Sequence, residues 1–168
     1  DRANSYLYCN EAQCPECGYI VPLSPSWIIG KGTKTIAILE NNGHSGFDID
    51  IKQGVTDQEI KECEKTATIK SGKMICPHCK TETAMSVIRN DITNDLGSKV
   101  YGIRKWGLNE FINQDTDILK QRLYCIRYIK KTIDKNGNEK EIRYYKKPNN
   151  LDYEREKKVI ELIEKKFE

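Results

Sequence analysis

Cys14-Pro15-Glu16-Cys17-Gly18 and Cys76-Pro77-His78-Cys79 share one pattern, in which Cys-Pro opens a C-x-x-C pair. Two residues between cysteines make a tight turn that aims both sulfurs at one point, and Gly18 relieves crowding where backbone amides face the sulfurs. Two such knuckles supply four thiolates, the ligand set that structural zinc prefers. The sequence therefore predicts a tetrahedral metal site formed by Cys14, Cys17, Cys76 and Cys79.

Other roles for these cysteines are a disulfide, a redox dithiol and an iron site. Disulfides explain a duplicated C-x-x-C pattern less well than metal does, and neither pair sits in the βαβ pattern of a redox dithiol. Iron stays open, because Cys-Pro-x-Cys-Gly also resembles a rubredoxin knuckle and four thiolates do not separate iron from zinc. Of the three remaining cysteines, Cys9 lies near the first knuckle as an outside ligand candidate, Cys63 is spare, and Cys125 reads as core.

The segment between the knuckles, residues 18–75, is 58 residues long, well beyond the roughly 15–20 of a compact zinc ribbon. We expect inserted strands here. A strand leads into the first knuckle and residues 19–23 leave it as a hairpin. Residues 35–39 are β-rich, and residues 47–51 alternate as a half-buried strand does.

Helix and strand signals continue toward the second knuckle. Thr56-Asp57-Gln58-Glu59 is a capping-box pattern, which predicts a short helix to about Lys65. Residues 66–69 and 73–75 read as strands around a Ser71-Gly72 turn. Residues 84–88 read as a strand that leaves the second knuckle as a hairpin.

The C-terminal part has one clear hairpin and one helix. Residues 122–133 and 139–147 are strand-like runs joined by a loop that contains Asn136-Gly137, a strong hairpin signal. Residues 152–167 form an amphipathic pattern typical of a helix. Residues 90–117 show no readable pattern.

We therefore expect an α+β, mostly β fold: a zinc ribbon with a long insertion, a C-terminal β-hairpin and a terminal amphipathic helix. The predicted division is a zinc-ribbon domain at residues 1–89, followed by residues 90–168 packed on it.

Composition limits the class of protein. The chain has 168 residues, of which 38% are hydrophobic and 32% charged, and 28 basic against 25 acidic side chains give a net charge of +3. That balance does not by itself indicate nucleic-acid binding. No apolar run of about 18 residues predicts a membrane span, so no membrane partner is expected. Thiols in a metal pattern suit a reducing compartment, so we expect a cytoplasmic location. A chain that starts at Asp1 suggests a piece of a longer protein.

The sequence offers no catalytic machinery of its own. Its five prolines include no adjacent pair, so a catalytic Pro-Pro motif is impossible in this chain. Gly30-Lys31-Gly32 looks like a cofactor-binding glycine loop, but β-branched residues follow where such a loop requires a helix. His44 and His78 lie in turns and read as solvated residues. We predict no catalytic residue here.

Basic residues interleaved with aromatic ones are candidates for DNA contact, because phosphate contact and base stacking need that combination. One group is Arg104-Lys105-Trp106, and the other lies on the C-terminal hairpin among Tyr128, Tyr144 and Tyr145. The alternative for the hairpin is a solvated sheet surface whose tyrosines pack on the C-terminal helix. The residues predicted to contact DNA are Arg104, Lys105, Trp106, Arg127, Lys130 and Arg143.

Several segments together resemble a known family. They are Tyr6-Leu7-Tyr8, the first knuckle with its Val21-Pro22-Leu23 tail and Ser26-Trp27, the second knuckle, Gln121 to Tyr128, and Tyr144 to Pro148 with Asp152. In these segments the chain is similar to the large adenine-specific DNA methylases that carry a zinc ribbon.

The resemblance implies a parent enzyme of restriction-modification type, which transfers a methyl group from S-adenosylmethionine to the exocyclic amine of adenine in DNA. The family's Asp/Asn-Pro-Pro-Tyr loop and cofactor pocket have no match here, so they are expected outside this chain. The resemblance carries over only the metal role of the four knuckle cysteines. The expected function is thus a non-catalytic zinc domain that contacts DNA or shapes target recognition. The alternatives are a purely structural or protein-interaction module that braces the methylase core, and a rubredoxin-like iron protein.

Overall fold

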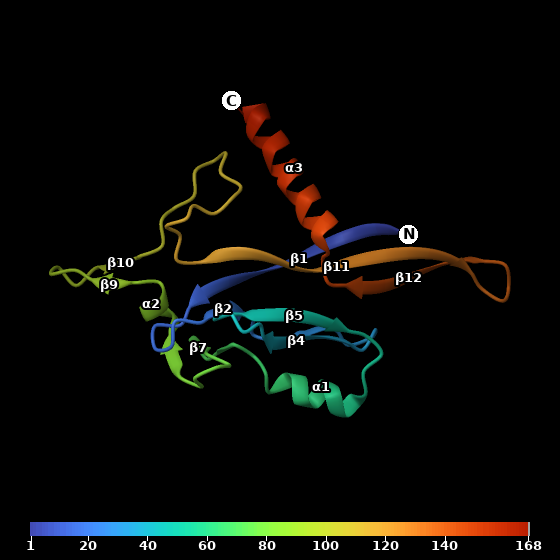
Figure 1. The fold of residues 1–168 in the computed structure, drawn as a ribbon, viewed down its shortest axis with the longest axis horizontal. Coiled ribbons are helices and arrows are strands. Elements are labelled where there is room, and N and C mark those ends of the chain that lie inside the picture. Colours follow the sequence, from blue (N-terminus) through green and yellow to red (C-terminus); the bar gives the residue numbers. More distant parts are fainter. Residues whose placement is uncertain (168) are drawn as a thin grey trace.

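The computed structural model describes residues 1–167, and it is mostly β with a few helices. Its strands form one four-stranded sheet, two three-stranded sheets and one two-stranded hairpin. The four-stranded sheet runs along the molecule, with a helix rising from one side and the smaller sheets on the other (Figure 1). The predicted mostly β class is confirmed.

The four-stranded sheet joins the two ends of the chain. Its order is β12-β11-β1-β2, and all its neighbours are antiparallel. Strand β1 (Arg2–Gln13) pairs with β11 (Lys120–Ile133) from Arg2 opposite Ile129 to Glu11 opposite Lys120. Strands β2 (Ile20–Leu23) and β12 (Glu139–Lys146) form the edges. The pairing of β1 with β11 therefore joins the two predicted domains, residues 1–89 and 90–168. The division into these domains stays a prediction.

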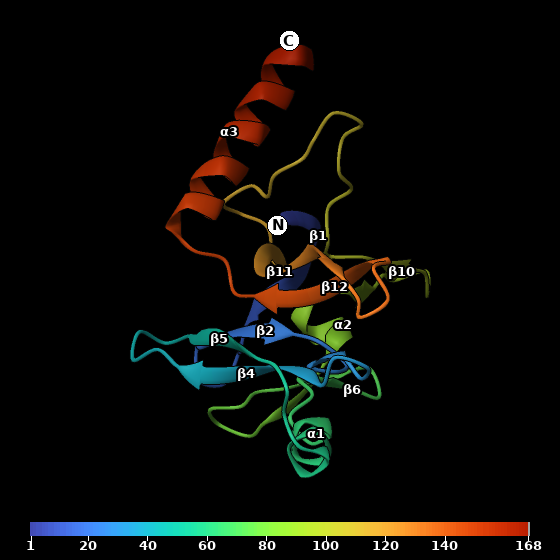
Figure 2. The ribbon, with the colours of Figure 1, turned by 90° about the vertical axis from the view of Figure 1, so that its right-hand side faces the viewer.

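A second sheet lies under the first, in the order β3-β4-β5. It contains β3 (Ile28–Gly30), β4 (Thr35–Asn41) and β5 (Phe47–Lys52), and helix α1 (Asp57–Glu64) packs below it (Figure 2). Trp27 is 1% exposed and forms the centre of this layer. The predicted capping box is confirmed, since the Thr56 hydroxyl accepts from the Glu59 N–H and the Glu59 carboxylate accepts from the Thr56 N–H.

The third sheet carries the second knuckle and corrects two sequence-based expectations. It consists of β6 (Ile69–Lys70), β7 (Lys73–Ile75) and β8 (Glu82–Ala84), followed by the short helix α2 (Met85–Ile88). The strand predicted over residues 84–88 is wrong, because the chain turns into α2 after Ala84. The strand predicted over residues 66–69 begins only at Ile69. Thr68 is fully buried and bonds to β2 instead, donating to the Pro22 carbonyl at 2.6 Å.

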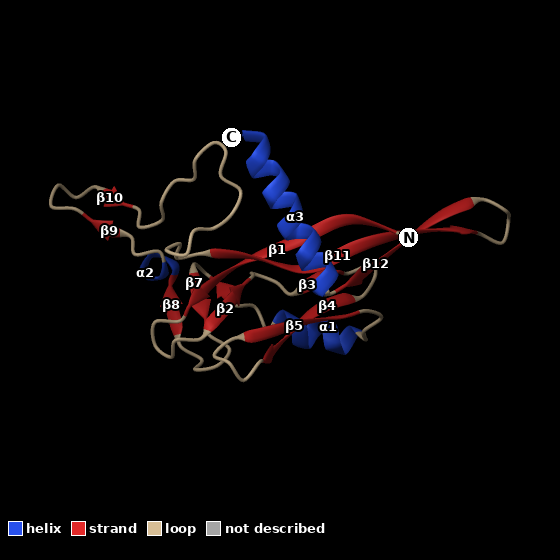
Figure 3. Ribbon diagram, turned by 45° about the horizontal axis from the view of Figure 1, so that its top comes forward, coloured by secondary structure: helices blue, strands red, loops and turns tan. Residues whose placement is uncertain are grey.

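Residues 90–119 form a projecting hairpin and a long loop, and they include residues 90–117, where the sequence shows no readable pattern. The hairpin pairs β9 (Ile92–Thr93) with β10 (Lys99–Val100). Figure 3 shows this hairpin and the β11–β12 tip at opposite ends of the molecule.

The terminal helix α3 (Asn150–Phe167) confirms the predicted C-terminal helix. Its first turns contact the four-stranded sheet, where the Tyr8 hydroxyl donates to Glu156 at 2.6 Å and the Tyr153 hydroxyl donates to the Leu123 carbonyl at 3.2 Å. The helix then rises away from the sheet (Figure 1). No helix within residues 1–167 is both long and apolar enough to cross a membrane.

Candidate metal centre

The first knuckle is built where β1 turns into β2. The Cys14 N–H donates to the Tyr19 carbonyl at 2.8 Å, and the Gly18 N–H donates to the Cys14 carbonyl at 2.9 Å. Gly18 has φ +78°, in the left-handed region that glycine adopts without steric cost. The knuckle is thus a hydrogen-bonded turn closed by its glycine, as its sequence predicts.

The second knuckle, between β7 and β8, repeats this geometry bond for bond. The Cys76 N–H donates to the Thr81 carbonyl at 3.1 Å, and the Lys80 N–H donates to the Cys76 carbonyl at 2.9 Å. Lys80 takes the place of Gly18 with φ +64°. An L-residue in this conformation costs roughly 1–2 kcal/mol, so the second knuckle folds the same way under more strain.

The two knuckles bring four sulfurs together. The Sγ atoms of Cys14 and Cys79 are 3.7 Å apart, those of Cys17 and Cys76 are 3.6 Å apart, and all four lie within 4.8 Å of one another. A tetrahedral zinc site with Zn–S bonds of about 2.3 Å has S···S edges of about 3.8 Å. The cluster therefore fits a four-thiolate metal site, in which the longer edges, at most 4.8 Å, would contract by up to about 1 Å.

The cysteines of the cluster differ in environment. Burial raises the pKa of Cys76 to about 12 and also raises that of Cys14, although backbone N–H groups of each knuckle act against the shift. Hydrogen bonds from Thr81 lower the pKa of Cys79 to about 6. Thiolates bind zinc and buried thiols do not ionise readily, so a dication at the centre would offset this burial cost. Amide donors aimed at sulfur are compatible with that role.

Apolar side chains and one aromatic stack surround the cluster. Cys14 and Cys76 are both fully buried in a core with Val21 and Met74. The His78 ring stacks on the Tyr19 ring, with centroids 3.7 Å apart and planes 8° apart. His78 is exposed, as expected for a residue in this turn, but its ring packs against Tyr19, a contact that no local sequence pattern predicts.

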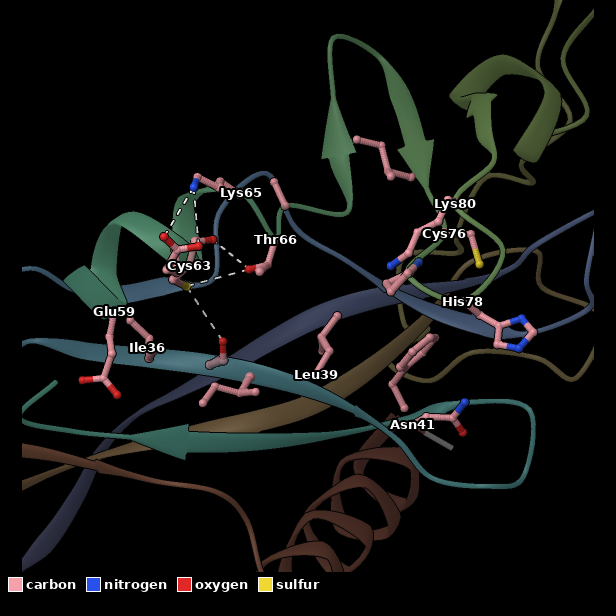
Figure 4. Close-up of a pocket in the computed structure, with 17 residues that line it drawn as sticks. Ile36, Leu39, Asn41, Glu59, Cys63, Lys65, Thr66, Cys76, His78 and Lys80 are labelled. Atoms are coloured by element: carbon pink, nitrogen blue, oxygen red, sulfur yellow. Dashed lines mark hydrogen bonds and ion pairs between the residues drawn. The ribbon is translucent and has the colours of Figure 1, made fainter. Parts of the chain in front are cut away.

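A groove with a volume of about 820 Å³ runs beside the second knuckle, between β4 and α1 (Figure 4). Its rim carboxylates are paired with lysines, Glu59 with Lys52 at 2.6 Å and Glu62 with Lys65 at 3.4 Å. Cys63 lies at its wall, and burial raises the pKa of this thiol. A protonated, buried thiol is a poor nucleophile, so the groove supplies no catalytic group of this kind.

The first predicted DNA-contacting group is tied into its own loop. The Arg104 guanidinium donates to Asp117 at 2.8 Å and to Glu110 at 2.6 Å, and it lies 5.4 Å from the centre of the Trp106 ring. These ion pairs lower the pKa of both carboxyl groups. Two carboxylates thus already satisfy the Arg104 charge, and Lys105 is exposed beside it.

The second predicted group does not share one surface. Partners across an antiparallel pair point to the same side of the sheet, and successive residues alternate between sides. Arg127 lies opposite Tyr145 and Arg143 lies opposite Ile129, so both arginines are on one side and Lys130 is on the other. The Arg127 guanidinium also donates to Asn4 at 2.6 Å. The loop between β10 and β11, which contains Arg104, lies well away from the β11–β12 tip, which forms the right-hand end of the molecule in Figure 1.

Cys9 and Cys125 lie outside the cluster. Cys9 is 7% exposed and packs in the core around Trp27, and Cys125 is fully buried, as predicted. Within residues 1–167, the group able to hold a metal consists of the four knuckle cysteines.

A comparison with family models, with curated proteins and with solved structures found no match to this chain.

Proposed function

We propose that this chain is a structural zinc domain in which Cys14, Cys17, Cys76 and Cys79 hold one Zn²⁺. The observation that carries the proposal is the cluster of four sulfurs within 4.8 Å, drawn from two turns of the same geometry. Four protein thiolates leave no open position for a substrate, which is typical of structural rather than catalytic zinc.

The metal would link two parts of the fold that lie far apart in the sequence. One ligand pair ends the β1–β2 hairpin, and the other belongs to the small β6-β7-β8 sheet, with residues 18–75 between them. Structural zinc contributes on the order of 10–16 kcal/mol in small zinc peptides, comparable to the ~5–15 kcal/mol stability of a whole domain. Removing the metal should therefore unfold much of this chain.

We propose further that the domain belongs to a larger S-adenosylmethionine-dependent adenine DNA methyltransferase and assists its contact with DNA. The support is the sequence resemblance around the first knuckle and at Gln121 to Tyr128, together with the basic hairpin. The cofactor and the catalytic loop would lie in the rest of that protein. The reading frame that encodes this chain should then also encode an Asp/Asn-Pro-Pro-Tyr motif. A complete frame without one would overturn this assignment.

DNA contact is tested by fluorescence anisotropy of the zinc-loaded chain with a labelled duplex of mixed sequence. Binding through phosphates should weaken by ~0.9 log unit per log unit of salt for each contact. Absence of binding at low salt would favour the alternative, a module that only braces the methylase core. Iron in place of zinc would give a coloured protein and would favour the rubredoxin-like alternative.

A further inference from the structure

The β11–β12 hairpin extends beyond its neighbours in the sheet. The pairing of β1 with β11 stops at Ile129, whereas β11 and β12 stay paired out to Ile133 opposite Glu139. Residues 130–142 therefore form a two-stranded ribbon with no third strand, and it projects from one end of the molecule (Figures 1 and 3). Both sides of this ribbon are open to a partner.

The register sorts the charges of the hairpin by side. One side, named here the lysine face, carries Lys130 opposite Ile142, Lys140 opposite Thr132, and Lys146 opposite Ile126. It also carries Tyr128 opposite Tyr144. Within the paired residues 126–133 and 139–146, this face has three positive charges and no acidic side chain.

The acidic residues of the two strands lie on the opposite side. Glu139 and Glu141 alternate with Lys140 along β12, and Glu141 lies opposite Lys131. Lys131 also forms an ion pair with Glu139 at 3.5 Å. Lys130, Lys140 and Lys146 are all exposed, and none of them is in an ion pair within residues 1–167.

An aromatic pair holds the base of the lysine face in shape. The Tyr128 and Tyr144 rings stack with centroids 5.3 Å apart and planes 14° apart, and the Lys146 ammonium lies 5.5 Å from the centre of the Tyr144 ring. Two acidic groups approach this face. The Tyr144 hydroxyl donates to the Asp1 carboxylate at 2.7 Å, and burial together with the nearby Asp152 carboxylate raises the pKa of Tyr128. The lysines are therefore presented from a braced surface.

We propose that the lysine face binds the phosphate backbone of DNA. Lys140 and Lys146 are six residues apart on β12, or about 20 Å at ~3.3 Å per residue, and Lys130 lies between them on the neighbouring strand. One strand of B-DNA carries a phosphate every ~3.4 Å along the axis, so this span covers about six nucleotides. Lys130 and Lys140 lie on the protruding ribbon, and Lys146 lies at its base, where β11 also pairs with β1. Charge of one sign along this extended surface complements a linear polyanion. The inference rests on the proposed function and assigns its DNA contact to particular residues.

The experiment compares two variants that lose the same charge on opposite sides of the hairpin. The test variant is Lys130→Gln/Lys140→Gln/Lys146→Gln, and the control is Lys131→Gln/Arg143→Gln/Lys147→Gln. Binding of the zinc-loaded chain to labelled duplex and single-stranded DNA is followed by anisotropy from low to high salt. Circular dichroism and zinc content are measured on each protein to verify folding.

The test variant should lose at least about tenfold in affinity at low salt, and its salt slope should fall by about 2 to 3, at ~0.9 per lost contact. The control should change the affinity less than about threefold. If the wild type binds DNA and the control loses as much affinity as the test variant, the assignment to the lysine face is overturned, while DNA contact stands. If the wild type binds no DNA, the proposed DNA contact and its assignment to the lysine face both fall, while the structural zinc site stands. If polyglutamate competes as well as DNA, the occupant is an acidic protein and the inference is overturned.

Discussion

The imidazole ring of His78 lies flat against the phenol ring of Tyr19, with centroids 3.7 Å apart and planes 8° apart. Tyr19 follows the first knuckle, and His78 lies between the cysteines of the second. The stack therefore bridges the same two segments that the four sulfurs bridge. Tyr19 is also held from the other direction, because its hydroxyl accepts from the Asn41 amide at 3.2 Å. The stack is thus a second contact between the two knuckles, and it does not involve the sulfur atoms.

A double-mutant cycle on this pair should detect coupling. Replacing His78 by Ala, Tyr19 by Ala, and both together should give an interaction free energy of about 0.5–1.5 kcal/mol, as found for aromatic pairs. The measurement is urea unfolding of the zinc-loaded proteins. Additive single-mutant effects would show that the stack contributes nothing to stability.

The residue after the second cysteine of each knuckle should respond in opposite ways to substitution. Gly18→Ala puts an alanine in the left-handed region and should destabilise the fold by roughly 1–2 kcal/mol. A steric clash adds nothing to this cost, because the nearest atom to the new Cβ is Gln13 Nε2 at 3.8 Å. Lys80→Gly removes the same strain but frees the unfolded chain, so it should be neutral to slightly stabilising. Thermal unfolding of the two variants tests this; a destabilised Lys80→Gly variant would contradict it.

Glu59 should stay ionised well below the usual range of a glutamate. Hydrogen bonds from Lys52 and from the Thr56 N–H lower the pKa of Glu59 to about 2. Because the folded-state pKa lies below the unfolded one, the stabilising effect is present above about pH 4.5 and is lost as the pH falls toward 2. The ¹³C shift of the Glu59 carboxyl group should therefore be flat between pH 7 and pH 4.

A paired variant provides the control for Glu59. Lys52→Gln/Thr56→Ala removes the Lys52 ammonium and the Thr56 hydroxyl, both of which donate to the Glu59 carboxylate, but it keeps the Thr56 N–H. The Glu59 carboxyl should therefore titrate at higher pH than in the wild type. Loss of the Thr56 cap should also cost about 1 kcal/mol of stability. If Glu59 titrates near pH 4 in the wild type, this description of the capping box is wrong.

Arg104 should act on its own loop rather than on DNA. Glu110 accepts from the Gly107 N–H at 2.9 Å, and Asp117 accepts from the Gln114 N–H at 2.8 Å, while both carboxylates hold Arg104. In Arg104→Gln, hydrogen exchange at these two amides should accelerate, with zinc content unchanged. DNA affinity should fall less than about threefold. A loss as large as that of the lysine-face variant would instead support direct DNA contact by Arg104.

Local patterns were sufficient for the parts of the fold that short-range chemistry determines. The cysteine spacing identified the four residues that cluster, Thr56 to Glu59 identified a helix start, and Asn136-Gly137 identified the hairpin. The helix start and the hairpin turn each depend on residues within a few positions of one another. The metal site depends on four cysteines whose C-x-x-C spacing is visible in the sequence. The identity of the metal is not among them, because zinc and iron accept the same thiolates.

Long-range pairing accounts for what the sequence did not predict. The register of β1 with β11 joins residues more than 100 positions apart, and no local pattern encodes it. Thr68 is predicted to lie in a strand, but it lies before β6. Its hydroxyl donates to the Pro22 carbonyl and accepts from the Ser24 N–H. The lysine face also required the register, since only the pairing shows that Lys130 and Arg143 lie on opposite sides.

Native mass spectrometry of the purified chain, combined with thiol counting before and after chelation, tests whether the four knuckle cysteines hold one structural zinc. We expect one zinc per chain, with four thiols released together on chelation and unfolding detected by circular dichroism. Cys17→Ser should lose the metal, whereas Cys9→Ala, which changes a buried cysteine outside the cluster, should keep it. A chain that binds no metal, or that binds iron, or that keeps its zinc in Cys17→Ser, would contradict the account.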